Sequence, residues 1–512
     1  MFDNEGQLIA NAPHMPVHLG SMGDSVQTVI EEYGDAMQPG DVFVLNNPYH
    51  GGTHLPDVTV ITPVFDEATL RGAKRNAFPT GGWKQETNQG WERKEGRPPL
   101  PLEKGQGDGH HVLFYVASRG HHADIGGITP GSMPSHSRTL DEEGVVIDVF
   151  KLVDKGKLRE AEMREMLTKA PYPTRNVEQN LADLRAQMAA NATGVQELHN
   201  MVQHFGLEVV QAYMQHVQDN AEAAVRQLLG VLKEGEFRYE LDDGAAIQVK
   251  ITIDKQQRSA IINFSGTSAQ QQSNFNAPTS VCKAAVLYVF RTLVQDDIPM
   301  NAGCLKPLQI IIPEGCLLNP TYPAAVVAGN VETSQCITDA LYGALGIMAA
   351  SQGTMNNFTF GNDKYQYYET LCGGSGAGPD FQGTSAIHTH MTNSRLTDPE
   401  VLEWRFPVLL ESFAIRQNSG GAGHYRGGDG VVRRIRFIEA MTASILSSHR
   451  RVPPYGMAGG EAGQTGNNWV QRVDGTRQTL AGTATVEMQA GDVFVIETPG
   501  GGGYGVRIKN EE

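Results

Sequence analysis

The sequence lacks most features of nucleic-acid-binding, membrane-spanning or disulfide-stabilised proteins. Lys and Arg number 41 against 57 Asp and Glu, and this formal net charge of −16, without any basic block, disfavours binding to a phosphate backbone. No apolar run reaches the 18 residues of a membrane span, and the beginning, MFDNEGQLIANAP, does not resemble a secretion signal. Five widely spaced cysteines without a CxxC pair argue against a disulfide framework or a zinc knuckle. We therefore expect a cytoplasmic protein.

Several common catalytic motifs are also missing. The sequence contains no GxxxxGK[ST] phosphate loop, no GxSxG nucleophile motif and no HExxH zinc motif. Gly500–Gly505 matches GxGxxG, but no helix can follow it before Glu512, so the βαβ context of a dinucleotide site is absent. The sequence thus offers no nucleotide-binding motif of its own.

Glycine, in contrast, is abundant. It supplies 58 of 512 residues, about 11%, compared with a usual level of roughly 7%. Much of it lies in doublets and quartets within apolar sequence. This pattern predicts tight loops beside a site.

The hydrophobic pattern predicts an α+β fold: a large, mixed, multi-lobed body with buried strands, a long helical hairpin and a strand-rich C-terminal part. Nearly continuous apolar runs at Val42–Leu45, Val58–Phe65 and Val112–Ala117 indicate strands covered on both faces. Residues 67–111 have no helical or strand period and are expected to form a surface insertion.

Two consecutive helices are expected between residues 176 and 232, separated at Gly206. Further strands are expected after residue 236, with helices near Ser280–Val294 and Thr333–Ala350; the strands are Ala246–Ile253, Ala260–Phe264, Leu308–Ile312, Val431–Phe437, Thr442–Leu446 and Val493–Glu497. The expected parts are an N-terminal strand-rich part (1–150), the helical hairpin (151–236) and a C-terminal strand-rich part (237–512).

Two segments are rich in residues that bind metals. The segments are Asn47–Asp57 and Ser118–Gly127. Each contains His-x-x-Asp and a Gly-Gly pair, and each lies just after a predicted buried strand. Imidazole nitrogen together with carboxylate oxygen suits Zn²⁺, Mn²⁺ or Fe²⁺, and so few protein ligands leave coordination positions open for catalysis. The alternative is that these side chains cap loops and hydrogen-bond one another.

Two further clusters carry polar groups of uncertain role. His388 and His390 would face the same way on a strand and could add metal ligands, and Arg395 could pair with a substrate carboxylate. Asn330 and Glu332 open a predicted helix, where they would either help to bind an anion or only cap the helix.

These segments resemble the hydantoinase B family, and more narrowly the hydantoinase B-like half of the ATP-dependent 5-oxoprolinases. The likeness covers nearly the whole chain apart from residues 67–111. The family resemblance is carried by Gly51–Asp57, Ser118–Gly127, Gly131–Pro134 and Thr498–Gly505. The narrower match is carried by Phe275–Pro278, Asn301–Pro307, Gly329–Gln335, Gly353–Phe358 and His390–Pro399.

The resemblance implies a function and a site. In such enzymes a hydantoinase A-like partner subunit uses ATP to phosphorylate the lactam oxygen, and the B-like part completes the hydrolysis of 5-oxoproline to glutamate, a reaction of glutathione metabolism. Related acetone carboxylases carry a divalent metal in the corresponding subunit. The implied metal ligands are His54, Asp57 and His121, and His122 and Asp124 are the expected catalytic base residues.

Three alternatives remain open from the sequence. The substrate could be a hydantoin or N-methylhydantoin, the reaction could be an ATP-dependent carboxylation, or the chain could be a non-catalytic scaffold for the ATPase subunit. In the first two cases the protein is again part of a hetero-oligomer with an ATPase.

Overall fold

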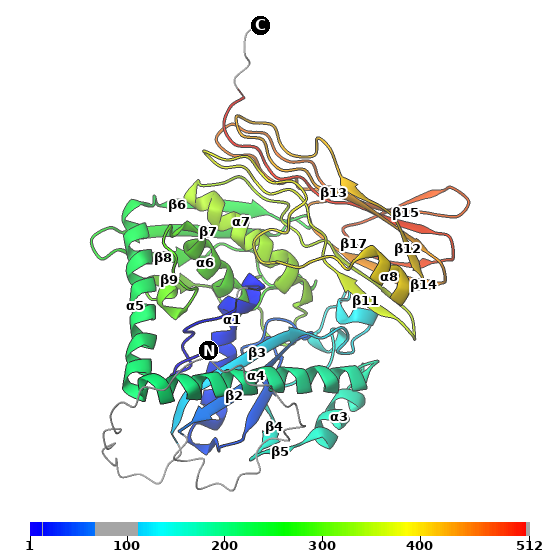
Figure 1. The fold of residues 1–512 in the computed structure, drawn as a ribbon. Helices are drawn as coiled ribbons and strands as arrows, with labels where there is room; N and C mark the ends of the chain where they lie inside the picture. Colours follow the sequence, from blue (N-terminus) through cyan, green and yellow to red (C-terminus); the bar gives the residue numbers. More distant parts are fainter. Residues whose placement is uncertain (13, 67–110, 508–512) are drawn as a thin grey trace, which may run out of the picture.

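The computed structural model describes residues 1–12, 14–66 and 111–507, so nearly all of the predicted insertion at 67–111 lies outside the described residues. The mixed α+β prediction is confirmed, with helices placed around and between several mainly antiparallel sheets (Figure 1). Among the described helices, none is both long enough and apolar enough to cross a membrane. All five cysteines are buried free thiols.

The N-terminal sheet has the strand order β3-β2-β1-β4-β5. Its strands are β1 (Val42–Leu45), β2 (Asp57–Phe65), β3 (Val112–His121), β4 (Phe150–Asp154) and β5 (Lys157–Leu158). Every residue of β1 and β2 is buried, as their continuous apolar sequences predict. One face packs against helix α1 (Pro16–Tyr33), and the other packs against helix α4 (Val177–Phe205).

Helix α1 begins at Pro16. The first part of the helix contains Gly20 and Gly23. Because glycine disfavours helix interiors, helix propensity does not predict a helix there. Gly20 is required by packing, since a Cβ atom there would lie 2.4 Å from Cα of Ala284 in helix α6 (Thr279–Leu293). The close contact fixes α1 against the centre of the molecule.

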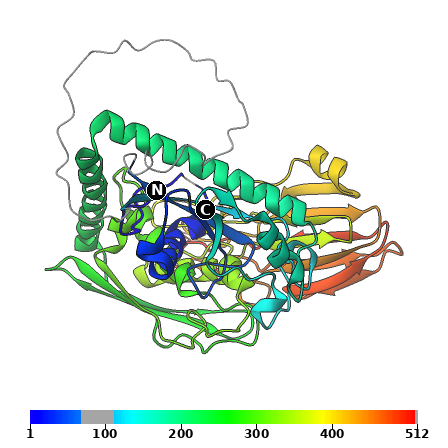
Figure 2. The ribbon, with the colours of Figure 1, turned by 90° about the horizontal axis from the view of Figure 1, so that it is seen from below.

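The two predicted consecutive helices are confirmed as α4 and α5 (Leu207–Val231), which meet at Gly206. They do not lie along each other as a hairpin would, and instead run in different directions in both views (Figures 1 and 2). The two helices pack on different sheets. Leu181 of α4 packs on the N-terminal sheet, whereas Val225 of α5 belongs to the core of the central sheet.

The central sheet contains β6 (Gly235–Glu240), β7 (Ala246–Asp254), β8 (Ser259–Asn263) and β9 (Leu308–Ile311), with β8 and β9 parallel. Helices α6 and α7 (Ser334–Leu345) contribute to the same core. A π-helical turn, Gly329–Thr333, leads directly into α7. Such turns are frequent at functional sites.

The C-terminal part is a sandwich of two antiparallel sheets, ordered β11-β10-β14-β17 and β12-β13-β18-β15-β16. Phenylalanines from both sheets, including Phe358 and Phe494, form its core. The strands are β10 (Asn357–Gly361), β11 (Gln366–Glu369), β12 (Val408–Ile415), β13 (Val431–Phe437), β14 (Met441–Leu446), β15 (Asn467–Gln471), β16 (Arg477–Leu480), β17 (Thr483–Met488) and β18 (Val493–Glu497). Short helices α3 (Glu160–Lys169) and α8 (Pro399–Arg405) complete the fold.

The glycine-rich segments near residues 373–383, 420–430, 456–466 and 500–505 pack backbone against backbone (Figure 1, yellow to red). A Cβ atom on Gly501 would lie 1.9 Å from the carbonyl oxygen of Ser375, so any larger residue would force these chains apart. Gly501 donates a backbone hydrogen bond to Gly428, which in turn donates one to Ser375. The glycines of these segments therefore allow close packing of extended chains.

Candidate metal centre

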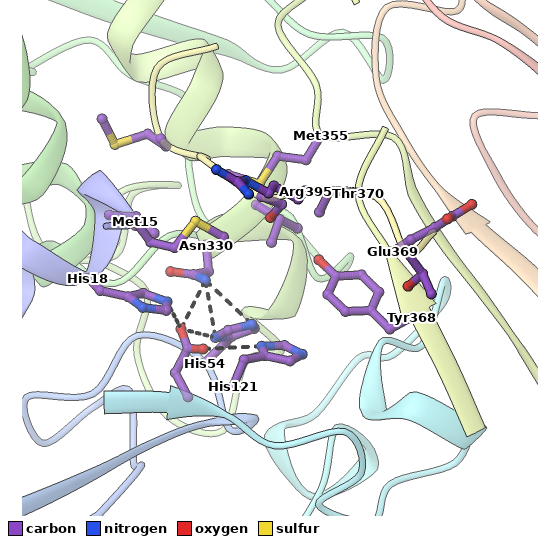
Figure 3. A pocket seen from close by; sticks show the side chains of 16 residues that line it. Met15, His18, His54, His121, Asn330, Met355, Tyr368, Glu369, Thr370 and Arg395 are labelled. Atoms are coloured by element: carbon purple, nitrogen blue, oxygen red, sulfur yellow. Dashed lines mark hydrogen bonds and ion pairs between the residues drawn. The ribbon is translucent and has the colours of Figure 1, made fainter. Parts of the chain in front are cut away.

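A cavity of about 230 Å³ lies where α1, the ends of β2 and β3, the π-helical turn and β11 meet (Figure 3). It is lined by side chains from segments that are far apart in the sequence: Met15, Val17, His18, His54, Asp57, His121, Asn330, Val331, Met355, Tyr368, Glu369, Thr370, Met391, Ser394, Arg395 and Thr397. The predicted ligands therefore line one shared, partly open cavity.

His54, Asp57 and His121 are brought together by the β2–β3 ladder. Asp57 is the first residue of β2 and is paired directly with His121, the last residue of β3. Asp57 Oδ2 lies 2.8 Å from His54 Nδ1, and Asp57 Oδ1 lies 3.1 Å from His121 Nδ1. One potential ligand atom from each of the three residues lies within 4.8 Å of the others. This arrangement can hold one metal ion.

Besides Thr53, which donates a hydrogen bond to Asp57 Oδ2 at 3.0 Å, two further residues contact Asp57; the sequence analysis did not single out His18, and it named Asn330 only as a possible anion-binding or capping residue. His18 of α1 places Nε2 2.7 Å from Asp57 Oδ2. Asn330, in the π-helical turn, places its side-chain nitrogen 3.3 Å from the same oxygen and 3.1 Å from His54 Nδ1. A signal for His18 was present in the spacing of polar residues: His18, Ser21 and Ser25 follow a helical period, and both serines are fully buried.

The electrostatics of the site favour the protonation states that bind metals. Burial opposes ionisation of the fully buried Asp57, but the surrounding imidazoles of His18, His54 and His121 more than offset it and hold the Asp57 pKa well below its usual value. Burial lowers the pKa of His54, which favours its neutral form. An ionised carboxylate and a neutral imidazole are the forms that coordinate a cation.

Two buried atoms in the cavity wall test whether a metal fits. His121 Nε2 and Asn330 Oδ1 are buried and have no hydrogen-bond partner among the described residues. Buried polar atoms are nearly always paired, so such unpaired atoms call for a ligand. Two imidazoles with one carboxylate suit Zn²⁺, Mn²⁺ or Fe²⁺ better than Ca²⁺ or Mg²⁺, which prefer sets of oxygen ligands. The residues of the site therefore suit a divalent transition-metal ion.

A network of hydrogen bonds supports the wall opposite Asp57. The ring of Tyr368 stacks on His121 with 5.0 Å between ring centroids, and its hydroxyl donates to Asn357 Oδ1 at 2.8 Å. Asn357 in turn donates to Glu332 Oε1 at 2.7 Å. Burial raises the pKa of Glu332 to about 7. The network fixes the ring that covers His121.

The structure does not bring His122 and Asp124 to this cavity. Successive side chains of a strand point to opposite faces, so His122 lies beneath α4, where Asn180 and Gln187 hydrogen-bond its two ring nitrogens. Asp124 accepts hydrogen bonds from the guanidinium of Arg175 at 2.8 Å and from three backbone N–H groups. Both side chains are fully engaged in holding the loop after β3 against α4.

The segment that contains His388 and His390 is not a strand in the structure. His390 has a positive φ of 52°, and its Nε2 lies 2.9 Å from Asp339 Oδ1 in the core under α7. Neither histidine lines the cavity, whereas Arg395 from the same segment does.

Comparisons with known proteins show the family to which the chain belongs. A family model described as hydantoinase B/oxoprolinase matches residues 1–76 and 103–507. The chain is 44% identical to 5-oxoprolinase 1 of Arabidopsis thaliana, over 99% of the chain and 39% of the plant protein. It is 42% identical to 5-oxoprolinase of Dictyostelium discoideum, over 99% of the chain and 37% of that protein. The chain thus spans about two fifths of the length of these relatives.

A solved structure shares the fold. The crystal structure of ATP-dependent caprolactamase from Pseudomonas jessenii superposes with a TM-score of 0.81 at 22% identity. The superposition covers 99% of this chain and 84% of the caprolactamase chain.

Proposed function

The chain belongs to the hydantoinase B/oxoprolinase family, and on this premise we propose that it is the hydrolytic component that opens the ring of 5-oxoproline in an ATP-dependent reaction. The observation that carries the proposal is the group of His54, Asp57 and His121 at the wall of a cavity that could hold a small cyclic amide. The relatives named 5-oxoprolinase support the choice of substrate.

The chemistry explains the need for ATP and for a partner. A lactam is a poor electrophile because its nitrogen lone pair stabilises the carbonyl group. Transfer of a phosphoryl group to the lactam oxygen removes this stabilisation, and water can then add to the ring carbon. The ring C–N bond breaks, the nitrogen takes a proton, and a second water releases phosphate to leave glutamate. We assign the phosphoryl transfer to a hydantoinase A-like ATPase subunit.

We propose that His54, Asp57 and His121 would hold a divalent cation at the cavity wall. When bound, such a cation acts as a Lewis acid and acidifies water. His18 orients the Asp57 carboxylate through the 2.7 Å contact, and Asn330 fixes the His54 ring. Tyr368 and Met355 line the cavity from the other side.

His122 and Asp124 receive a positioning role in this proposal. The His122 ring is held by Asn180 and Gln187 of α4, and its backbone N–H donates a hydrogen bond to Pro56 O, next to Asp57. Loss of either side chain would act through the position of His121. The buried free thiols agree with a reducing, cytoplasmic location, which we include in the proposal.

The test is a reconstituted reaction. The full chain is mixed with its ATPase partner, ATP and 5-oxoproline, and glutamate and phosphate are measured together. We expect both products to appear with the wild-type chain, and glutamate to be lost with His54→Ala and His121→Ala. Phosphate release without glutamate from the wild-type mixture would contradict the proposed reaction. Equal metal content in all three proteins would instead favour a scaffold subunit.

A further inference from the structure

Arg395 differs from the other charged residues of the cavity because it has no partner. Its exposed side chain lines the cavity, on the side opposite to His54 and His121 (Figure 3). Its guanidinium makes no hydrogen bond or ion pair with any residue that the structure describes. A guanidinium is always charged and presents several N–H donors in one plane. Arg395 is therefore a free cation facing the space that a substrate would occupy.

The two carboxylates of the cavity wall already have partners. Glu369 accepts two hydrogen bonds from the buried guanidinium of Arg433, at 2.7 and 2.8 Å. Asp57 is contacted by the imidazoles described above. Among the described residues that line the cavity, Arg395 thus carries the charge that nothing balances. The cavity consequently favours an anionic ligand over a neutral one.

The segment that carries Arg395 is held in place at both ends. Thr397 accepts a hydrogen bond from the Tyr367 hydroxyl at 3.0 Å, and the backbone N–H of Asn393 points to the sulfur of Met15 at 3.1 Å. Met15 directly precedes α1, which carries His18. The same contacts therefore set the position of Arg395 relative to the predicted metal ligands.

We propose that Arg395 binds the carboxylate of 5-oxoproline and so selects cyclic amides that carry an anionic group. This inference rests on the proposed function and adds the residue that determines specificity. A guanidinium binds a carboxylate with two parallel N–H···O bonds, which orients as well as attracts it. With the carboxylate at Arg395, the ring carbonyl points across the cavity towards His54 and His121. A site built around such a pair rejects analogues that lack the charged group.

The test compares two ligands that differ in the carboxylate only: 5-oxoproline and 2-pyrrolidinone. Binding of each to the full chain is measured by ligand-observed saturation-transfer NMR titration for wild type, Arg395→Gln and Arg395→Lys. Arg405→Gln is the matched control, because Arg405 is a surface arginine that lines a different cavity. Thermal melts confirm that each variant is folded.

We expect Arg395→Gln to weaken binding of 5-oxoproline by about ten- to a hundredfold and to leave 2-pyrrolidinone unchanged. Arg395→Lys keeps the charge but loses the paired donors, so its affinity for 5-oxoproline should lie between those of wild type and Arg395→Gln. The assignment is overturned if wild type does not prefer 5-oxoproline, or if Arg395→Gln weakens both ligands equally. If the reconstituted reaction releases no glutamate while this selective loss persists, the proposed reaction fails and the carboxylate site stands.

Discussion

Removal of the imidazoles around Asp57, one at a time, should lower the affinity for a divalent cation in a graded order. His54 and His121 each offer a ligand atom within the 4.8 Å group that includes Asp57. His18 lies outside that group and touches the carboxylate only. We therefore expect the loss of His54 or His121 to weaken binding far more than the loss of His18.

The expected magnitudes follow from these contacts. His18 orients a ligating carboxylate, and removal of such an outer partner typically costs 10- to 100-fold in metal affinity, or about 1.4–2.8 kcal/mol. His54→Ala and His121→Ala each remove a ligand itself, so their loss should exceed about a hundredfold. His50→Ala should have no effect, because His50 is largely exposed and pairs with the exposed Asp148.

The assay is a competition titration against a chelator of known affinity. The full chain is stripped of metal and titrated with Mn²⁺, Zn²⁺ and Fe²⁺, and the bound metal is checked by elemental mass spectrometry. His50→Ala serves as the control for a histidine change that leaves the cavity intact. The geometric reasoning is refuted if His18→Ala loses as much affinity as His54→Ala, or if all variants bind like the wild type.

Three other predictions concern stability, each measured by denaturant unfolding. Gly501→Ala should destabilise the fold by more than about 4 kcal/mol, because the glycine segments have no room for a Cβ atom. Gly230→Ala, on the open side of α5, should instead stabilise the fold by about 0.5–1 kcal/mol. Similar changes in stability for the two variants would contradict the close backbone packing. Burial raises the pKa of Glu332 to about 7, so the native state keeps a proton that the unfolded chain releases near pH 4.5. Wild type should therefore lose about 3 kcal/mol relative to Glu332→Gln as the pH rises from 4.5 through 7. Parallel pH profiles of the two proteins would count against this. Arg433→Met should lower the free energy of unfolding by about 3–5 kcal/mol, because it leaves Glu369 as an unpaired buried charge. Adding Glu369→Leu should recover most of this stability. If no stability is recovered, the loss of the ion pair is not the cause.

Much of the fold was predictable because its signals are local. Val42–Leu45, Val431–Phe437 and Val493–Glu497 were predicted as strands and have these bounds in the structure. An apolar run between turn residues needs no distant partner to indicate a buried strand. The direction in which a helix leaves its neighbour has no such local signal. For this reason α4 and α5 were predicted as elements, but their divergence was not.

In the site, too, some features were predictable from the sequence and others were not. The resemblance drew attention to His54, Asp57 and His121, and the structure places them together. The sequence analysis ended the third strand at Ala117, whereas it continues to His121. With the longer strand, alternation alone would have separated His121 from His122.

The sequence by itself determined which segments form the buried strands and which side chains can coordinate a metal, because apolar character and ligand chemistry belong to the residues themselves. Only the tertiary structure decided which of these side chains share one cavity. The antiparallel pairing of β2 and β3 set His121 opposite Asp57, and the packing of α1 and the π-helical turn added His18 and Asn330. Arg395 reached the same cavity through a segment held by long-range contacts. Such contacts join residues separated by tens to hundreds of positions, and no local pattern encodes them.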